Sequence, residues 1–352
     1  MTTETTPNPQ THPQWEPDVL GEGFFARSLP LGDDPDGEGK VQATLVAYCP
    51  EGHPSSTSSS ARAAQPAILY VHGMSDYFFQ RHLALALTSA GYAFYAIDLR
   101  KCGRSHREGQ RWHYVSDLTY YYNDLDAARQ AITDLGHTSL IGLGHSTGGL
   151  ILAIWYDYLH KHGTFSGIDG LILNSPWLDM QFSPVVVGLG KLIGPLWAKW
   201  APTTPIPGGS FTAYVESLHQ DFHGEWDFDL EWKRPAGNAK YWQWLLNVMA
   251  HQDRVKAGEI DVQVPTLVLH SDQSYLGKPY SAATDTADVI VDVDQIRAAA
   301  PHLGTRVTTV AIPGARHDVF LSLPVARAQA QEAMLAWLAE HLPAPTATEE
   351  TL

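Results

Sequence analysis

Ser139-Leu-Ile-Gly-Leu-Gly-His-Ser-Thr-Gly-Gly149 is the stretch that decides the fold class of this 352-residue chain. It begins as a short apolar run, 140–143, and ends in a serine flanked by glycines. A helical pattern, Leu150-Ile-Leu-Ala-Ile-Trp-Tyr156, follows directly. We therefore predict a strand, a sharp turn at Ser146 and a helix, the arrangement that lifts a serine hydroxyl clear of a sheet.

The turn itself, Gly144-His-Ser146-Thr-Gly148, matches the G-x-S-x-G pattern of a nucleophile elbow. Gly144 and Gly148 lack the Cβ atoms that would collide in so tight a turn. The same five residues could form an ordinary Gly/Ser turn, but the strand before them and the helix after them favour the elbow. We predict Ser146 as a catalytic nucleophile.

The alternation of apolar strands and helical patterns extends on both sides of this turn. Strands are predicted at 24–31, 41–48, 67–71, 93–97, 140–143, 170–173, 266–269 and 307–312. Helices are predicted at 80–90, 120–134, 150–160, 293–300 and 325–341. This pattern indicates an α/β fold, with a mostly parallel eight-stranded sheet and helices on both faces. The first two strands have no helix between them, so we expect them to form an antiparallel edge.

One interval, 176–263, breaks the alternation, and we predict it to be a helical cap inserted into the α/β core. The core then has two parts, 19–175 and 264–342. The chain ends, 1–18 and 343–352, are rich in Thr, Pro and Glu and are predicted as disordered tails. The polar segment 51–65 is predicted as a flexible surface loop.

The expected cap is unusually aromatic and apolar. Seven of the eleven tryptophans lie in it: Trp177, Trp197, Trp200, Trp226, Trp232, Trp242 and Trp244. We expect most of them to be core residues. The run 185–197 is more apolar than a solvated helix needs, so it could line a pocket or rest on a lipid surface.

Composition and charge exclude several classes of protein. The formal net charge of −15 argues against nucleic acid as a partner. No apolar stretch reaches the ~18 residues of a membrane span, and no secretory signal is visible at the start of the sequence. Cys49 and Cys102 could form one disulfide but not a disulfide framework. We expect a cytoplasmic enzyme and leave its oligomeric state open.

The seventeen histidines show no metal-ligand spacing, and the glycines of 142–149 lack the acidic residue of a dinucleotide site. We therefore expect no metal and no cofactor.

A serine nucleophile needs a histidine base that a carboxylate orients, in the chain order Ser, acid, His. His317, just past the last strand, is the best base, because the others after the cap end a buried strand or fall in helices: His270, His302 and His341. Two acids remain open. Asp288 precedes a helix and is preferred, whereas Asp272 follows the strand 266–269.

An oxyanion hole needs backbone N–H groups aimed at the developing negative charge. The residue after the nucleophile, Thr147, supplies one. The turn after the strand 67–71 supplies the other, and Met74 is the candidate there. Asp98 precedes the serine in the chain, so we expect it to order a loop rather than to orient the base.

These residues resemble the α/β-hydrolase superfamily, in the monoacylglycerol lipase and lysophospholipase-like branch that includes serine aminopeptidases. The resemblance spans about residues 40–340. It rests on the elbow and on four further motifs: His72-Gly73, Asp98-Leu-Arg-x-x-Gly-Arg-Ser105, Ala287-Asp288-Val-Ile-Val-Asp292 and Gly314-Ala-Arg-His317. It implies Ser146, Asp288 and His317 as the triad, with Met74 and Thr147 in the oxyanion hole. One departure is Lys101-Cys102, where the family usually has Gly-His.

We accordingly expect a serine hydrolase that cleaves carboxylic esters through an acyl-enzyme, similar to a monoacylglycerol lipase. A first alternative is an amidase or aminopeptidase, whose amine would be held by acidic residues of the cap: Glu216, Asp221, Glu225, Asp227, Asp229 and Glu231. A second is a non-catalytic ligand-binding protein that keeps the hydrolase fold.

Overall fold

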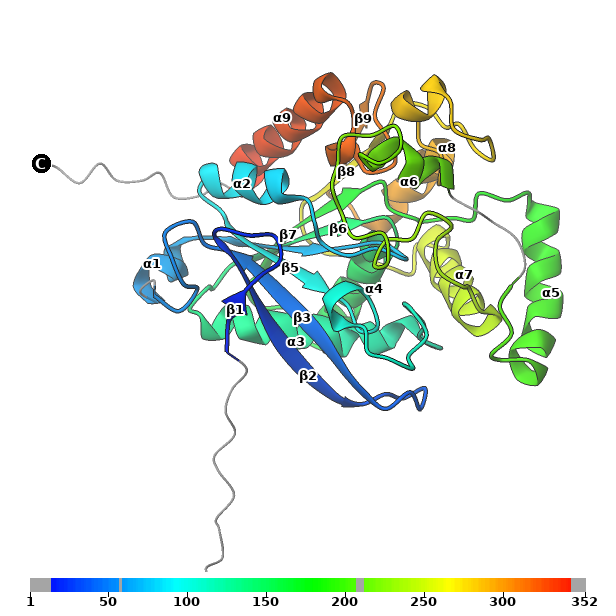
Figure 1. Cartoon of the computed structure of the whole chain (residues 1–352), viewed down its shortest axis with the longest axis horizontal. Helices are drawn as coiled ribbons and strands as arrows, with labels where there is room; N and C mark the ends of the chain where they lie inside the picture. Colours follow the sequence, from blue (N-terminus) through cyan, green and yellow to red (C-terminus); the bar gives the residue numbers. More distant parts are fainter. Residues whose placement is uncertain (1–13, 57–58, 207–211, 343–352) are drawn as a thin grey trace, which may run out of the picture.

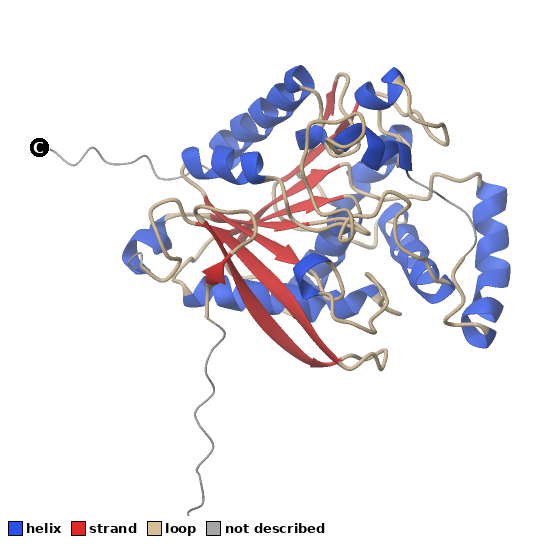
Figure 2. Ribbon diagram, in the orientation of Figure 1, coloured by secondary structure: helices blue, strands red, loops and turns tan. Residues whose placement is uncertain are grey.

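A mostly parallel sheet forms the centre of the computed structural model, which describes residues 14–56, 59–206 and 212–342 (Figures 1 and 2). Its described strands are β1 (Glu16–Pro17), β2 (Phe24–Asp33), β3 (Lys40–Tyr48), β4 (Ala67–Val71), β5 (Ala93–Asp98), β6 (Leu140–His145), β7 (Ile168–Asn174), β8 (Thr266–Ser271) and β9 (Val307–Ile312). They pair in the order β1-β2-β3-β5-β4-β6-β7-β8-β9. From β5 to β9 all pairings are parallel. Strands β2 and β3 form the expected antiparallel edge, which β1 extends and which β3 joins to β5, also antiparallel.

Helices cover both faces of the sheet, as predicted (Figure 2). Their bounds are α1 (Ser59–Ala64), α2 (Arg81–Ser89), α3 (Tyr121–Asp134), α4 (Thr147–Lys161), α5 (Pro184–Trp200), α6 (Thr212–Leu218), α7 (Trp242–Lys256), α8 (Val293–Ala299) and α9 (Pro324–His341). The described residues also form five short 3-10 turns: η1 (Gly103–Ser105), η2 (Leu118–Tyr120), η3 (Ala282–Thr286), η4 (Ala300–Leu303) and η5 (Val319–Leu321).

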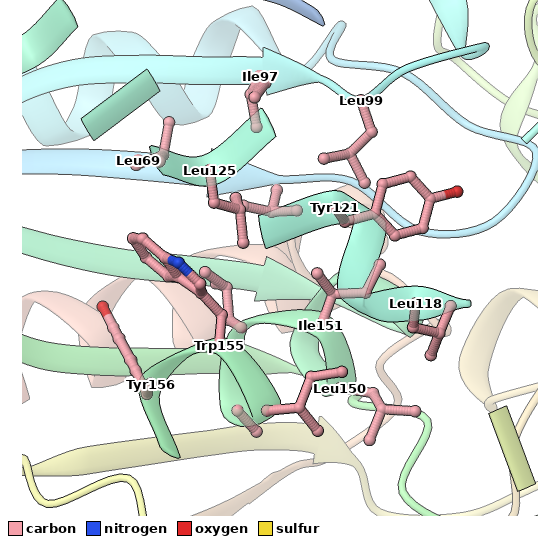
Figure 3. Close-up of a cluster of buried hydrophobic side chains, with 14 of the residues drawn as sticks. Leu69, Ile97, Leu99, Leu118, Tyr121, Leu125, Leu150, Ile151, Trp155 and Tyr156 are labelled. Carbon is pink, nitrogen blue, oxygen red and sulfur yellow. The ribbon is translucent and has the colours of Figure 1, made fainter. Parts of the chain in front are cut away.

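The side chains of β4 alternate between the two faces of the sheet, and an apolar layer covers each face. Leu69 and Val71 face a cluster built with α3 and α4, which Figure 3 shows around Trp155. Ile68 and Tyr70 face the opposite cluster, built with α2 and α9. Because both faces are apolar, every residue of β4 is buried. A strand of this kind lies inside the sheet, where its neighbours on both sides fix the position of the turn that follows it.

The predicted N-terminal tail, 1–18, is too long, because its last residues belong to the folded sheet. They include β1, so the described sheet has nine strands rather than the predicted eight. Trp15 is buried, β1 pairs with β2, and the Asp18 carboxylate accepts a 2.7 Å hydrogen bond from Arg104. These contacts hold residues 14–18 on the sheet edge, although their composition is that of a tail. The remainder of that tail, 1–13, and the other predicted tail, 343–352, lie outside the described residues.

The loop predicted at 51–65 is also partly wrong, because it contains α1. The Arg62 side chain of that helix is buried and donates a hydrogen bond to the Tyr95 hydroxyl at 3.2 Å. Lys101, where the family that the sequence resembles usually has glycine, is fully buried and bridges Asp34 and Glu38 at 2.6 and 2.9 Å. It therefore anchors the β2–β3 hairpin.

The interval 176–263 contains α5, α6 and α7. In Figure 1, α5 stands at the margin of the molecule beside α7. The two helices pack closely, since a Cβ at Gly194 would come within 2.9 Å of Trp242. Of the seven tryptophans, Trp177 and Trp244 are buried, and Trp226 and Trp232 are half-buried and pack against a core cluster. These four agree with the expectation that most are core residues. Trp197 and Trp200 do not, because they are 52% and 78% exposed near the end of α5.

Candidate active site

Ser146 occupies a sharp turn between β6 and α4, as the sequence predicts. Its backbone has φ 52° and ψ −117°, a conformation that side-chain-bearing residues rarely adopt. A Cβ at Gly148 would approach the carbonyl oxygens of Val71 and His72 to 2.4 Å, and one at Gly144 would approach the Gly149 Cα to 2.7 Å. The two glycines are therefore required for the reason predicted, and the turn has the geometry of a nucleophile elbow.

His317 lies in the turn after β9, and its Nδ1 is 2.8 Å from Oδ2 of Asp288. Both side chains are buried. The other carboxylate oxygen of Asp288 accepts hydrogen bonds from the N–H groups of Ile290 and Val291, at 2.8 and 2.9 Å. A carboxylate can only accept, so Nδ1 of His317 carries the proton and its Nε2 has a free lone pair.

Asp272, the other candidate acid, does not contact the histidine. Its Oδ1 accepts a hydrogen bond from the N–H of Gly314 at 2.9 Å, and its side chain is exposed. Asp272 therefore braces the turn that leads to His317. The geometry favours Asp288 as the partner of the base.

Burial lowers the pKa of His317 from its usual value, although the Asp288 carboxylate opposes this effect. The ring is therefore neutral at pH 7 and can accept a proton. Its neighbour Asp318 holds the turn in place. The Asp318 carboxylate accepts hydrogen bonds from Asn174, at the end of β7, at 2.7 Å, and from Gln80, before α2, at 3.0 Å.

Met74 and Thr147, the candidate oxyanion donors, both line the pocket that contains Ser146 and His317. Thr147 is the first residue of α4, so its N–H lies at the positive end of a helix. On the other side, Nε2 of His72 accepts the N–H of Leu99 at 3.0 Å, so its Nδ1 donates to the Gly73 carbonyl at 2.7 Å. The N–H of Met74 belongs to that same peptide and points the opposite way. His72 therefore orients this donor.

The pocket has a volume of about 320 Å³, within the range of small-molecule sites. Its apolar wall combines residues of the core with residues of the interval 176–263: Trp177, Phe182, Val215, Trp244, Leu245 and Ile290. Its polar wall comes mainly from the segment between α6 and α7, which supplies Lys233, Arg234 and Lys240. The sequence did not single out these three cations, because a loop segment has no periodicity that marks an inward-facing side chain.

Three contacts join that segment to the turn after β4. Lys233 Nζ pairs with Asp76 Oδ1 at 2.7 Å. The N–H of Asn238 donates to the Ser75 hydroxyl at 3.0 Å, and the N–H of Asp229 donates to the Tyr77 hydroxyl at 2.7 Å. The polar wall of the pocket and the turn that carries Met74 are thus one connected unit.

Asp98 orders a loop, as expected. Its carboxylate accepts hydrogen bonds from the N–H groups of Phe78 and Arg104, at 2.9 and 3.0 Å.

Cys49 and Cys102 are free thiols, so the one disulfide that the sequence allowed does not form. Among the described residues, His, Cys, Asp and Glu side chains form no group of three that could hold a metal ion. No described helix is long and apolar enough to cross a membrane.

Comparison with known proteins agrees with the fold described above. The model of a family described as serine aminopeptidase, S33, matches residues 62–323. The monoacylglycerol lipase of Paleococcus ferrophilus is 20% identical, with a TM-score of 0.57 over 79% of this chain and 96% of that one. A soluble variant of the Saccharomyces cerevisiae monoglyceride lipase is 19% identical (TM-score 0.60, 97% and 100% covered). A carboxyl esterase from Bacillus coagulans is 17% identical (TM-score 0.61, 90% and 98% covered). At these identities the likeness to the solved structures shows the fold.

Proposed function

The chain belongs to the serine aminopeptidase S33 family of α/β hydrolases, and on this basis we propose that it is a serine carboxylesterase. The observation that carries the proposal is the 2.8 Å pair of His317 and Asp288 in the pocket where Ser146 sits at its strained turn. Ser146 is the nucleophile, His317 the base and Asp288 the residue that orients it.

The reaction has two steps. Ser146 Oγ attacks the ester carbonyl carbon while Nε2 of His317 takes its proton, and the N–H groups of Met74 and Thr147 stabilise the oxyanion. The tetrahedral adduct collapses, the imidazolium returns the proton to the leaving alcohol, and an acyl-serine remains. Water then attacks this acyl-enzyme, with His317 again as the base, and the carboxylic acid leaves.

The charges in the pocket support an ester rather than an amino-terminal substrate. An aminopeptidase must hold a protonated amine, for which buried carboxylates are the suitable partners. None of the six acidic residues considered for this role lines the pocket, and five of them are exposed. Among the described lining residues Asp76 is the one carboxylate, and Lys233 already occupies it.

The residues 176–263 form the cap of this proposal, and their aromatic side chains select the acyl group. A wall containing Trp177, Phe182 and Trp244 suits a medium-chain or aromatic acyl ester, and the fold likeness to monoacylglycerol lipases supports a monoacylglycerol as one candidate. A chain-length panel of 4-nitrophenyl esters, run with and without Ser146→Ala, tests the proposal. Full activity in Ser146→Ala would refute it.

The rival reading, a ligand-binding protein without activity, makes a different prediction for the same serine. An activated serine reacts with a fluorophosphonate probe, and a passive one does not. We expect stoichiometric labelling of the wild type and none of Ser146→Ala. Absence of labelling in a folded wild-type protein would favour the binding protein.

The outer face of α5 supports contact of the cap with a lipid surface as part of the proposal. Seven of its apolar side chains are more than half exposed: Val185, Val186, Leu189, Leu192, Leu196, Trp197 and Trp200. Such a surface is suited to the boundary of a lipid phase. Sedimentation with phosphatidylcholine vesicles should be reduced by Leu192→Glu, and unchanged sedimentation would contradict this contact.

A further inference from the structure

The segment 273–287 connects β8 to Asp288, contains η3 and makes contacts on both sides of the pair formed by His317 and Asp288. Its first residues bind the main chain around Asp288, and its last turn binds the side chain of Arg316, the residue before His317. The pair itself depends on one side-chain hydrogen bond of 2.8 Å between two turns that follow different strands. Other contacts must therefore hold the two turns at this distance.

Two main-chain hydrogen bonds fix the peptide groups of Asp288. Its N–H donates to the Gln273 carbonyl at 2.9 Å, and its carbonyl accepts the N–H of Tyr275 at 2.7 Å. Ser274 and Asp288 are thus paired in a short parallel bridge. This bridge fixes the main chain of Asp288 relative to the carboxyl end of β8.

The Ser274 hydroxyl fixes the turn that follows Asp288. It donates to the Val291 carbonyl at 3.1 Å and accepts the N–H of Val293 at 2.9 Å. The N–H of Val291 in turn donates to the Asp288 carboxylate at 2.9 Å. One side chain therefore holds the turn whose N–H groups orient the carboxylate.

Arg316 connects the same segment to the base. Its side chain is buried, and its Nη2 lies 2.6 Å from Oδ1 of Asp285. Its Nη1 donates to the Leu321 carbonyl at 2.9 Å, and its main-chain N–H donates to the Ser322 hydroxyl at 2.9 Å. Since His317 follows across one planar peptide, these contacts also restrict the position of His317.

Asp285 is itself held in place for this contact. Its other oxygen, Oδ2, accepts a hydrogen bond from the Tyr280 hydroxyl at 2.9 Å. At the start of η3, Ser281 and Thr284 exchange reciprocal side-chain hydrogen bonds, which hold the turn that carries Asp285. The Asp285 side chain is 18% exposed and that of Arg316 is 2% exposed, so solvent screens this ion pair less than a surface pair.

We propose that Asp285 and Ser274 are positioning residues of the hydrolytic reaction. Asp285 acts on His317 through Arg316, and Ser274 acts on Asp288 through the turn that follows it. Neither lines the pocket, so neither touches the substrate there. The inference rests on the proposed esterase function and adds to it the residues that align the base, where a misplacement of about 1 Å can cost roughly 10²-fold in rate.

Steady-state kinetics on one 4-nitrophenyl ester test this on the full chain. Asp285→Ala and Ser274→Ala should each lower kcat at least about tenfold and change KM less than about twofold, because the ester still binds but the base is no longer aligned. Asp285→Glu, which keeps the carboxylate, and Ser274→Thr, which keeps the hydroxyl, should recover most of the loss. Ser274→Ala keeps the test decisive if the loss of Asp285 prevents folding.

Asp34→Ala is the matched control for Asp285→Ala. Asp34 is likewise a carboxylate paired with a buried cation, because it lies 2.6 Å from Lys101 in the β2–β3 hairpin. Asp34→Ala should lower stability in urea while the folded protein keeps its kcat. If Asp285→Ala lost no more kcat than Asp34→Ala, the role of Asp285 would be structural only and the inference would be overturned.

The loss must also depend on the acid. In Asp288→Asn the pair is already disrupted, so adding Asp285→Ala should lower kcat by less than about threefold. A further loss as large as that in the wild type would show that Asp285 acts independently of the pair.

A readout without turnover separates this inference from the esterase proposal. The Nδ1–H of His317 should give a downfield proton resonance in NMR spectra that is absent in His317→Gln. It should broaden or disappear in Asp285→Ala and Ser274→Ala but persist in Asp34→Ala. If the wild type hydrolysed no ester and the resonance behaved in this way, the esterase proposal would fail and the positioning of the pair would stand. A resonance that persists in both variants, or an unchanged kcat in both, would refute the inference and leave the esterase function intact.

Discussion

Lys233 and Asp76 form a buried ion pair, 2.7 Å apart, that joins the segment between α6 and α7 to the turn after β4. Burial alone would raise the pKa of Asp76, but Lys233 and His145 outweigh it and hold that pKa below its usual range. The pair connects the polar wall of the pocket to the turn that carries Met74. A substitution in that wall is therefore expected to disturb this turn, and the reverse.

Removing the cation of this pair should destabilise the fold. Lys233→Met leaves the Asp76 carboxylate buried without its main counter-charge, which typically costs about 3–5 kcal/mol. Urea unfolding would measure the loss. The double variant Asp76→Asn/Lys233→Met should recover part of it, because no uncompensated charge then remains. A single variant within about 0.5 kcal/mol of the wild type would contradict this account.

Asp288→Asn should lower kcat by roughly 10³–10⁴-fold, because the amide no longer fixes the tautomer of His317. Asp272→Asn is the matched control, since Asp272 braces the neighbouring turn without touching the ring. We expect it to keep kcat within about tenfold. Kinetics on one 4-nitrophenyl ester would decide the point, and the reverse ranking would make Asp272 the acid.

The acidic limb of the pH profile should fall below the usual histidine pKa of 6.5. Burial lowers the pKa of His317, so the neutral base persists to lower pH and kcat/KM is lost only as pH falls through that lowered value. In Asp288→Asn the residual limb should move lower still, because the carboxylate raises this pKa. A limb at or above 6.5, with the protein folded by circular dichroism, would be inconsistent with this base.

Gly148→Ala should abolish activity and destabilise the chain by several kcal/mol, because the new Cβ would lie 2.4 Å from two backbone oxygens that cannot move independently. Gly188→Ala is the control, since a Cβ there meets nothing within 4 Å and α5 is helical at that position. That change should raise stability by up to about 1 kcal/mol. Thermal unfolding of both variants tests the contrast.

The strands and the turn at Ser146 were predictable because they depend on residues that are neighbours in the sequence. The eight expected strands and the elbow follow from apolar runs and glycine spacing, so Ser146 and its two glycines were located from neighbouring residues. The pairing of His317 with Asp288 rather than Asp272 depends on how two turns after different strands meet, which periodicity does not encode. Asp288 was preferred because it precedes a predicted helix, and the resemblance to a known family strengthened that preference.

Other features depend on contacts made across the chain. A strand of two residues such as β1 is too short to show an alternation of apolar and polar side chains. Trp15, just before it, is buried in the fold. Arg62 likewise stabilises α1 in a serine-rich stretch through a distant tyrosine hydroxyl. Lys233, Lys240 and Tyr214 enter the pocket from segments whose direction is set by tertiary packing. Residues of this kind are visible only in the structure.

The turn that holds His317 should complete its folding late. Through Asp318 it is hydrogen-bonded to Asn174 and Gln80, which lie 144 and 238 positions earlier in the sequence. The turn at Ser146, in contrast, joins two adjacent elements, β6 and α4. Contacts of such separation form late, because closing long loops is entropically costly. During refolding the serine turn should therefore form well before the base is in place. Recovery of turnover then reports docking of the last strand and helix, and spectroscopic recovery of helix content should precede it.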